Sequence, residues 1–332
     1  MSRVRSRLVA LAVGICLAVT VSELVVRLYE GFPLLPLVPP AVTPAPRIHI
    51  VPSPSRGYEL PRGEWPATNS VGLRDYERPL EKPPGTFRIL GLGDSVTYGY
   101  RVPLDDSILK VLERRLNATG EGQYDVLNLG VPGYNTVQEE RMLEEVGLAY
   151  APDLILLTYV LNDADEVLDA QDAIGRAADL AEPPPLLAET IGRFYLPQLV
   201  YSRQAQLREL DDPAAKFAKD QPGWQASRNA LAEMARLARA HGVPLAVAIF
   251  PFLVHLDQRH PYAAIYQLIA STVRQVGGHP IELLPAFLGQ AARPLWVGPA
   301  DYHPNARAHA IMALAVEAGL REEHLLPTSG AR

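Results

Sequence analysis

Short apolar runs alternate with amphipathic stretches from residue 87 onward, and this alternation restricts the fold more than any other feature of the chain. The apolar runs are typical of strands buried on both faces; they are FRILGLGDS, YDVLNLGVPG, DLILLTYVLND, VPLAVAIFPF and HPIELLPAF. The stretches between them place apolar residues at three and four spacing, as amphipathic helices do; they are LDDSILKVLERRL, TVQEERMLEEVGLAY, WQASRNALAEMARLARAHG and YAAIYQLIASTVRQVG. This order predicts an α/β fold with a mostly parallel sheet and helices on both sides.

The composition of the 332 residues is that of an ordinary globular protein. With 48% hydrophobic residues, the chain can bury a full core in one large domain or two small ones. Its formal net charge of -6 offers no basic excess for a nucleic-acid surface and indicates no protein partner by itself. The single cysteine, Cys16, excludes an intramolecular disulfide and leaves the redox compartment open.

The N-terminal segment, residues 1–30, has the pattern of a membrane anchor or a signal segment. Three arginines, Arg3, Arg5 and Arg7, precede an apolar run over residues 8–21. Because no small-residue cleavage site follows, we expect an uncleaved single-pass anchor in the cytoplasmic membrane. The arginines then stay on the cytoplasmic side, and the rest of the chain is extracytoplasmic, either periplasmic or extracellular. A cleaved signal peptide and a soluble protein with a buried apolar helix are the alternatives.

Residues 31–66 hold many of the chain's 31 prolines, which can neither continue a helix nor join a central strand. We expect an extended extracytoplasmic linker there. The next stretch, NSVGLRDYERP, fits either a strap over the domain or more linker. The globular domain is predicted over residues 67–325, with an insertion at about 164–222 that breaks the strand and helix rhythm and could cap a site.

Polar residues and glycines follow the apolar runs, at the edge where ligands collect in parallel α/β sheets. They are Gly93, Asp94 and Ser95 after the first run, Gly130 and Gly133 after the second, Asn162 and Asp163 after the third, and Asp301 and His303 before the last helix. A serine, a histidine and an acid therefore fall at one edge. This constellation predicts that Ser95 is a nucleophile.

Nucleophilic chemistry explains why these residue types occur together. A serine hydroxyl is a weak nucleophile until a base takes its proton, and histidine is the natural base near neutral pH. A carboxylate fixes the imidazole tautomer and stabilises its charged form. A glycine amide and an asparagine side chain, here Gly133 and Asn162, can donate to the oxyanion of the tetrahedral intermediate. We expect Asp94 to support the site by capping the helix after Ser95.

Four blocks in this order resemble the SGNH, or GDSL, hydrolase family over roughly residues 87–320. The blocks are Gly93-Asp94-Ser95, Gly133 in NLGVPGYNT, Asn162 in VLND, and Asp301 with His303 in DYHPN. The resemblance implies a three-layer α/β/α sandwich of the flavodoxin-like type. It also implies that Ser95 is the nucleophile and first oxyanion-hole donor, that Gly133 and Asn162 complete the hole, and that His303 is the base.

Two positions depart from the family pattern. Leu161 stands where the family usually has a glycine before Asn-Asp. The family's acid usually lies three residues before the histidine, where this chain has Ala300, and Asp301 lies two before it. Asp301 is the candidate acid, and a histidine oriented by a backbone carbonyl is the alternative.

The other histidines and motifs indicate no further chemistry. We expect His309 to have no catalytic part, and we interpret His255 and His260 as loop residues or substrate contacts because they lack paired metal spacing. No cofactor and no metal are predicted: Val96 stands where a dinucleotide fingerprint needs glycine, and there is no phosphate loop and no G-x-S-x-G elbow. Asn117 begins a glycosylation sequon of a kind that is common by chance.

Three functions remain open at this point. The first is a membrane-anchored ester hydrolase (an esterase, lipase or acylhydrolase) acting on a lipid, a carbohydrate or a small ester. The second is an O-acyltransferase or deacetylase that acts on cell-envelope polysaccharide or lipid with the same residues. The third is a non-catalytic binding module, against which the intact serine and histidine weigh. The natural substrate and any protein partner cannot be predicted from these residues.

Overall fold

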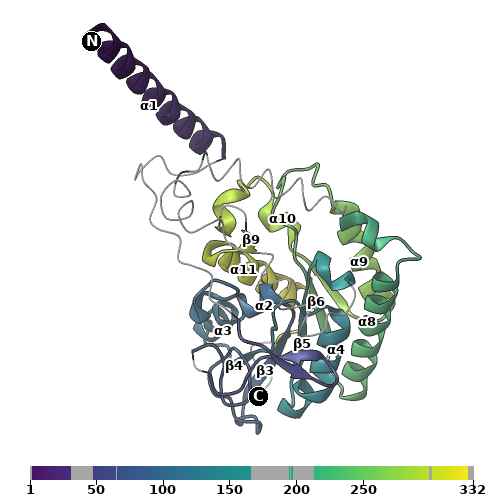
Figure 1. The fold of residues 1–332 in the computed structure, drawn as a ribbon. Helices are drawn as coiled ribbons and strands as arrows, with labels where there is room; N and C mark the ends of the chain where they lie inside the picture. Colours follow the sequence, from purple (N-terminus) through teal and green to yellow (C-terminus); the bar gives the residue numbers. More distant parts are fainter. Residues whose placement is uncertain are drawn as a thin grey trace.

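A five-stranded, fully parallel sheet lies at the centre of the domain in the computed structural model, which describes residues 2–30, 48–64, 66–165, 194, 196, 213–298 and 301–327 (Figure 1). In spatial order the strands are β4 (Gln123–Asn128), β3 (Thr86–Leu92), β5 (Leu154–Tyr159), β6 (Leu245–Ile249) and β7 (His279–Glu282). Each of them coincides with one of the five apolar runs, except that β3 and β4 begin one residue before theirs. The predicted strands are therefore confirmed.

Helices cover both faces of this sheet and complete three layers (Figure 1). The helices on one face are α4 (Thr136–Glu145), α8 (Pro222–Ala240) and α9 (Ala263–Gln275). Those on the other face are α3 (Ile108–Ala118), the short α10 (Leu284–Phe287) and α11 (Ala306–Glu322). The predicted α/β/α sandwich is confirmed.

Successive strand residues point to opposite faces, and both faces are buried. On β3, Leu90 and Leu92 pack on the side of α4 and α8, whereas Ile89 packs on the side of α3 and α11. Because both faces of the sheet are buried, the strand sequences are continuous apolar runs in which polar residues do not alternate with apolar ones. This burial made the strands recognisable in the sequence.

The strand order reverses between β3 and β5. The chain leaves β3 for β4 on one side and then crosses to β5 on the other, so the loops after β3 and β5 diverge at their carboxyl ends. Open parallel sheets bind ligands at such a point, and the order here is the flavodoxin-like one. The loops that carry Ser95 and Asn162 are these two loops.

Part of the predicted linker belongs to the domain, and the boundary at residue 66 needs correction. Strands β1 (Val51–Ser53) and β2 (Gly57–Glu59) form an antiparallel hairpin. Tyr58 is completely buried, and its hydroxyl donates to the Pro132 carbonyl at 2.9 Å. Prolines are compatible with a two-stranded hairpin of this kind because both strands are edges. Residues 31–47 lie outside the described part of the chain.

The stretch NSVGLRDYERP is an ordered strap and not more linker. Asn69, Leu73 and Asp75 are buried. The Asp75 carboxylate pairs with Lys110 Nζ at 2.7 Å and accepts a hydrogen bond from the Asn128 amide at 2.9 Å. The strap is thus tied to α3 and to the end of β4.

Three further elements complete the described chain around the site. A short helix, α2 (Ser95–Tyr98), follows β3, and an antiparallel pair, β8 (Trp296–Gly298) and β9 (Asp301–Pro304), precedes α11. The sequence pattern did not predict the β8–β9 pair. Most of the predicted insertion, residues 166–193, 195 and 197–212, lies outside the described residues.

The N-terminal helix α1 (Ser2–Glu30) projects away from the domain (Figure 1). Its stretch Val4–Leu28 is long and apolar enough to cross a membrane, and only 11% of its apolar window is buried. Twenty-five helical residues span about 38 Å, against about 30 Å for the hydrocarbon core. This exposure contradicts the alternative of a buried core helix. An anchor and a signal sequence both fit.

Candidate active site

The turn between β3 and α2 presents Ser95. Gly93 has φ +150°, and a Cβ there would lie 2.0 Å from Thr97 Oγ1, so the turn accepts no side chain. Asp94 then caps α2, because its Oδ1 accepts a hydrogen bond from the Val96 amide at 2.8 Å. Ser95 is the first residue of α2, held between a strand end and a capped helix start.

A line of hydrogen bonds joins Ser95 to a histidine and an acid. Ser95 Oγ lies 2.9 Å from His303 Nε2, and His303 Nδ1 lies 2.5 Å from Asp301 Oδ1. A carboxylate only accepts, so Nδ1 carries the proton and donates it to Asp301. The Nε2 lone pair is then left to accept the hydroxyl proton of Ser95.

The short spacing between acid and histidine follows from the β9 backbone. Residues two apart on a strand point to the same face, so Asp301 and His303 lie side by side. The same Asp301 Oδ1 also accepts from the His303 backbone amide at 3.1 Å. An extended segment therefore brings the carboxylate to the ring with one residue fewer than the family pattern uses.

The charges around His303 favour its imidazolium form. Burial lowers the pKa of His303, but the hydrogen bond and negative charge of Asp301, assisted by Asp94, outweigh burial, and the net pKa is raised. Burial likewise opposes ionisation of Asp301, yet the hydrogen bonds and charge of His303, together with Arg101, lower the pKa of its carboxyl. The Asp301 carboxylate therefore stabilises the protonated form of the His303 ring.

Two neighbours of this pair, Tyr100 and Arg101, were not predicted from the sequence. Arg101 Nη1 lies 3.4 Å from Asp301 Oδ2, the carboxylate oxygen that faces away from the ring, and Arg101 has φ +59°. The Tyr100 ring packs on the His303 ring with centroids 4.8 Å apart. Both residues follow α2 just after Gly99, so one segment carries Ser95 and also contacts Asp301 and His303. Nothing in the letters "YGYR" signals this, because it depends on where β9 lies.

Replacing Arg101 should move the pH dependence of the reaction. The guanidinium opposes a positive charge on His303, so Arg101→Met should raise the pKa of His303. A histidine that acts as a base must be neutral, so the acidic limb of the kcat/KM profile should shift to higher pH. Arg101→Lys keeps the charge and is the matched control, with a smaller shift. A limb that stays in place or moves to lower pH contradicts this role.

Asn162 lies beside Asp94 on the short 3-10 helix Leu161–Ala164 that follows β5. Its Nδ2 donates to Asp94 Oδ2 at 3.0 Å, and the same oxygen lies 3.1 Å from Ser95 Oγ. One N–H of the Asn162 amide is used in this way, and no acceptor among the described residues takes the second. Leu161, in place of the usual glycine, packs against the core cluster under α4 and α8.

Gly133 lies in the loop after β4 with φ +81°, and a Cβ there would lie 2.7 Å from the Tyr58 hydroxyl. Among the hydrogen bonds of the described residues, none joins Gly133 to Ser95, Asn162 or His303. The earlier Gly130 packs on the backbone of α2, where a Cβ would lie 2.3 Å from the Tyr98 amide nitrogen. The structure thus brings five candidate residues into one hydrogen-bonded network, and among the described residues Gly133 is not bonded to it.

Two of the other histidines, His309 and His260, serve the fold. His309 is buried, its Nδ1 accepts from the Ile108 amide at 3.1 Å, and burial lowers its pKa to about 3. A neutral His309 therefore provides a hydrogen-bond acceptor for the Ile108 amide, which lies at the start of α3. His260 is buried in its loop, its Nε2 lies 3.0 Å from the Phe252 carbonyl, and burial lowers its pKa. His255 is exposed.

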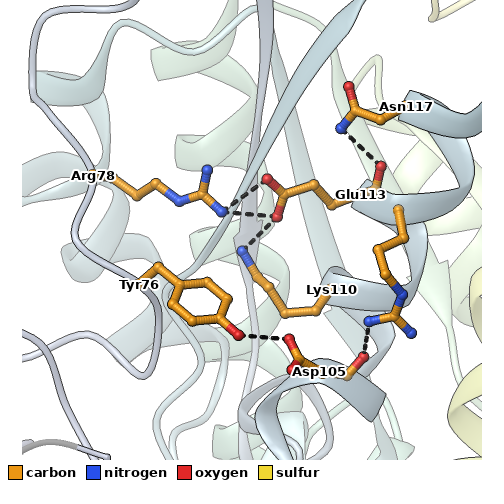
Figure 2. Close-up of a pocket in the computed structure, with 7 residues that line it drawn as sticks. Tyr76, Arg78, Asp105, Lys110, Glu113 and Asn117 are labelled. Carbon is orange, nitrogen blue, oxygen red and sulfur yellow. Dashed lines mark hydrogen bonds and ion pairs between the residues drawn. The ribbon is translucent and has the colours of Figure 1, made fainter. Parts of the chain in front are cut away.

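A hollow of about 370 Å³ lies away from Ser95, between the strap and α3 (Figure 2). Its lining residues are Tyr76, Arg78, Asp105, Lys110, Glu113, Arg114 and Asn117. Its charges pair with one another: Arg78 and Lys110 both bind Glu113 at 2.8 Å. The arrangement stabilises the strap and leaves little for a charged ligand to bind.

The glycosylation sequon lies in the same hollow. Asn117 Nδ2 donates to the Glu113 and Tyr124 carbonyls, both at 2.9 Å, and its Oδ1 accepts from the Tyr124 amide at 3.0 Å. The amide nitrogen that a glycan would modify is thus already engaged. The structure favours a structural role for Asn117.

The sandwich and its strand order are consistent with the α/β fold of SGNH hydrolases. Residues 92–311 match the model of the GDSL-like Lipase/Acylhydrolase family, and the chain belongs to this family. The resemblance seen in the sequence is confirmed.

Solved structures with a similar fold include several hydrolases. TesA is 16% identical, with a TM-score of 0.46 over 72% of this chain and 99% of that chain. A mutant of Axe2, an acetyl-xylooligosaccharide esterase from Geobacillus, is 14% identical, with a TM-score of 0.47 over 75% of this chain and 100% of that chain. A lipase/acylhydrolase from Enterococcus faecalis is 14% identical, with a TM-score of 0.44 over 71% and 96% of the two chains. No curated protein sequence matches the chain.

Proposed function

We propose that the protein is a membrane-anchored serine ester hydrolase in which Ser95 is the nucleophile, His303 the base and Asp301 the residue that orients it. The observation that carries this proposal is the unbroken line of contacts, 2.9 Å from Ser95 Oγ to His303 Nε2 and 2.5 Å from Nδ1 to Asp301. Family membership supports the ester as the bond that is cleaved.

The chemistry follows from the positions of the protons. As Ser95 Oγ attacks the ester carbonyl, its proton passes to His303 Nε2, and Asp301 stabilises the imidazolium through Nδ1. The tetrahedral intermediate collapses, and the leaving alkoxide takes the proton from Nε2. Water then repeats the two steps on the acyl-enzyme, which releases the acid and restores the Ser95 hydroxyl.

The negative oxygen of the intermediate needs donors near Ser95. We assign this role to the Ser95 backbone amide, the second N–H of Asn162 and the Gly133 amide. The order β4, β3, β5 supports the assignment, since the three loops follow adjacent strands. Asp94 holds Asn162 at 3.0 Å and so aims its side chain.

Asn162→Ala should lower kcat by about 10²- to 10³-fold, with a much smaller effect on KM, since an oxyanion donor acts mainly in the transition state. Steady-state kinetics on an aryl ester measures both constants. Asn117→Ala, which removes an amide from the hollow by α3, is the control for general destabilisation. An effect confined to KM would show that Asn162 contacts substrate and not the oxyanion.

Covalent labelling tests the function as a whole. A fluorophosphonate should label wild-type protein at Ser95, and a panel of aryl esters of increasing acyl length should show which chain fits. Products that require an added sugar or lipid alcohol would indicate acyl transfer instead of hydrolysis. Absence of labelling and of ester cleavage would favour a binding module and overturn the proposal.

We further propose that α1 remains attached as a single-pass anchor with the catalytic domain outside the cytoplasm. The apolar stretch Val4–Leu28 supports this, as do Arg5 and Arg7 at its start, since basic residues stay on the cytoplasmic side. Near the other end, Glu23 pairs with Arg27 at 2.9 Å, and Glu23 also accepts from the Leu196 amide at 2.8 Å. The charged groups of Glu23 and Arg27 therefore bind each other, and Glu23 also binds a backbone amide outside the helix.

The full-length protein should sediment with membranes and resist extraction by salt and carbonate. Gly14→Arg should weaken this association, because a charge at the helix centre costs about 2.5 to 3.5 kcal/mol on insertion scales. Gly14→Leu is the matched control, since a Cβ at Gly14 meets nothing within 4 Å. A mature chain that begins near the end of α1 would show a cleaved signal instead.

A further inference from the structure

Two carboxyl groups lie buried behind the site, and the proposed chemistry does not use them. Glu139 on α4 and Asp163 on the turn after β5 are each 1% exposed. Both oxygens of Glu139 and Oδ1 of Asp163 receive no hydrogen bond from an N–H or hydroxyl of the described residues. The fourth oxygen, Asp163 Oδ2, accepts from the Val160 amide at 2.5 Å.

Two ionised carboxylates cannot share such a place at low cost. Each buried charge without a donor loses its hydration, and like charges repel strongly at low dielectric. One proton held between the two groups removes both penalties, because a protonated carboxyl becomes a hydrogen-bond donor. Among the described residues no N–H or hydroxyl fills these oxygens, so a proton held by the pair itself supplies the missing donor.

We propose that Glu139 is protonated and donates to the Asp163 carboxylate, and that this pair positions the turn that carries Asn162. Asp163 is the next residue after Asn162, and its Oδ2 closes the turn onto the Val160 amide. The Asp163 carbonyl also accepts from Thr136 Oγ1 at 3.2 Å, three residues before Glu139 on α4. Two side chains of α4 thus hold the turn, one at its backbone and one at its carboxylate.

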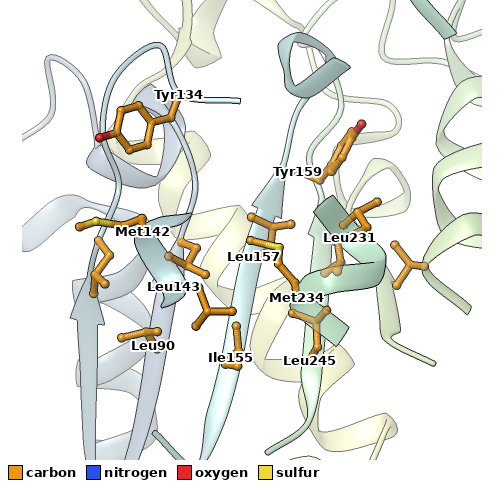
Figure 3. Packing of buried hydrophobic residues seen from close by; sticks show 14 of the residues in the cluster. Leu90, Tyr134, Met142, Leu143, Ile155, Leu157, Tyr159, Leu231, Met234 and Leu245 are labelled. Carbon is orange, nitrogen blue, oxygen red and sulfur yellow. The ribbon is translucent and has the colours of Figure 1, made fainter. Parts of the chain in front are cut away.

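Helix α4 is a firm support for such a contact. Asn135 caps its start with a reciprocal capping box involving Gln138. Met142 and Leu143 belong to the buried cluster that joins α4 to the sheet (Figure 3). A turn fixed to this helix keeps Asn162 in place next to Asp94. This positioning role rests on the proposed function of Asn162.

Burial and the neighbouring negative charges both favour the protonated form of the pair at neutral pH. Burial is the main cause that raises the pKa of Glu139, followed by the charges of Asp163 and Asp94. Burial also raises the pKa of Asp163, with Asp94 as the next cause. Tyr159 on β5 faces the pair as well, and burial raises its pKa. Loss of the shared proton at high pH would place two adjacent carboxylates behind Asp94, so it should form an alkaline limb of kcat.

Glu139→Gln and Glu139→Leu separate this role from simple packing. The glutamine amide can still donate to Asp163 but cannot ionise, so Glu139→Gln should keep most of the wild-type kcat and lose the alkaline limb. Glu139→Leu leaves Asp163 without its donor and should lower kcat on the order of 10²-fold through a displaced turn, with KM less affected. Equal losses in both variants, or an unchanged alkaline limb in Glu139→Gln, would overturn the proposal.

Infrared spectroscopy tests the proton without relying on activity or on the leucine variant. Slightly above neutral pH, exposed carboxyls are ionised, so a protonated buried carboxyl should give a distinct carbonyl band. The band should be present in wild type and in Ser95→Ala and absent in Glu139→Gln. A wild type without the band, or a band that persists in Glu139→Gln, would contradict the assignment. If Ser95→Ala keeps full activity while the band behaves as expected, the proposed function fails and the proton assignment stands.

Discussion

Ser95→Ala should abolish ester hydrolysis while leaving the protein folded. The substitution removes the oxygen that lies 2.9 Å from His303 Nε2, and no other hydroxyl takes its place in the hydrogen-bonded line among the described residues. Loss of a serine nucleophile costs on the order of 10⁶-fold in kcat where it acts with a histidine. Turnover of an aryl ester and fluorophosphonate labelling measure the loss, and circular dichroism checks the fold.

The fold should survive because Ser95 is only partly buried and its backbone position depends on Gly93 and Asp94. Ser271→Ala is a matched control, since Ser271 is an exposed serine on α9. It should keep full activity and full labelling. A Ser95→Ala protein that still cleaves esters at the wild-type rate would mean that another residue is the nucleophile.

The sandwich could be predicted from the sequence because its strands are buried on both faces. Strands such as β5, in which every residue is buried, leave an uninterrupted apolar run between polar turns. The β1–β2 and β8–β9 hairpins have no such signature, since their strands are three or four residues long and only partly buried. Prolines around β1 favoured a linker in the sequence, whereas the buried Tyr58 and Leu60 in the structure show that the segment packs on the domain.

The residues proposed for the site could be chosen from the sequence because they lie in the segments that follow the predicted strands or precede the last helix. The loops after β3 and β5 leave adjacent strand ends at one edge of a parallel sheet, so Ser95 and Asn162, near the start of these loops, are placed close together in such a fold. The supporting groups follow no such rule. Arg101 reaches Asp301 only because β9 lies over the end of α2, and Glu139 meets Asp163 only through the packing of α4. In the sequence, Arg101 and Glu139 look like ordinary charged surface residues.

Asp301→Asn should be strongly impaired, and His303→Ala should be nearly inactive. An asparagine at residue 301 can donate its amide to Nδ1, which would place the ring proton on Nε2 and remove the acceptor for Ser95. It also supplies no charge to stabilise the imidazolium. Where an orienting acid has this role, its replacement by asparagine costs about 10⁴-fold in kcat. The loss should therefore appear mainly in turnover, with Asp220→Asn, an exposed change, as the control.

The pH profile of Asp301→Asn is a second, independent test of whether Asp301 orients His303. Asp301 is the main group that raises the pKa of His303, so its loss should lower that pKa and move the acidic limb of the residual activity to lower pH. Arg101→Met acts on the same ring with the opposite sign, so the two variants should shift the limb in opposite directions. If Asp301→Asn keeps near wild-type turnover across the neutral range while His303→Ala loses it, Asp301 does not orient the base. A main-chain carbonyl or another carboxylate would then have to bind Nδ1, and the 2.5 Å contact would be structural only.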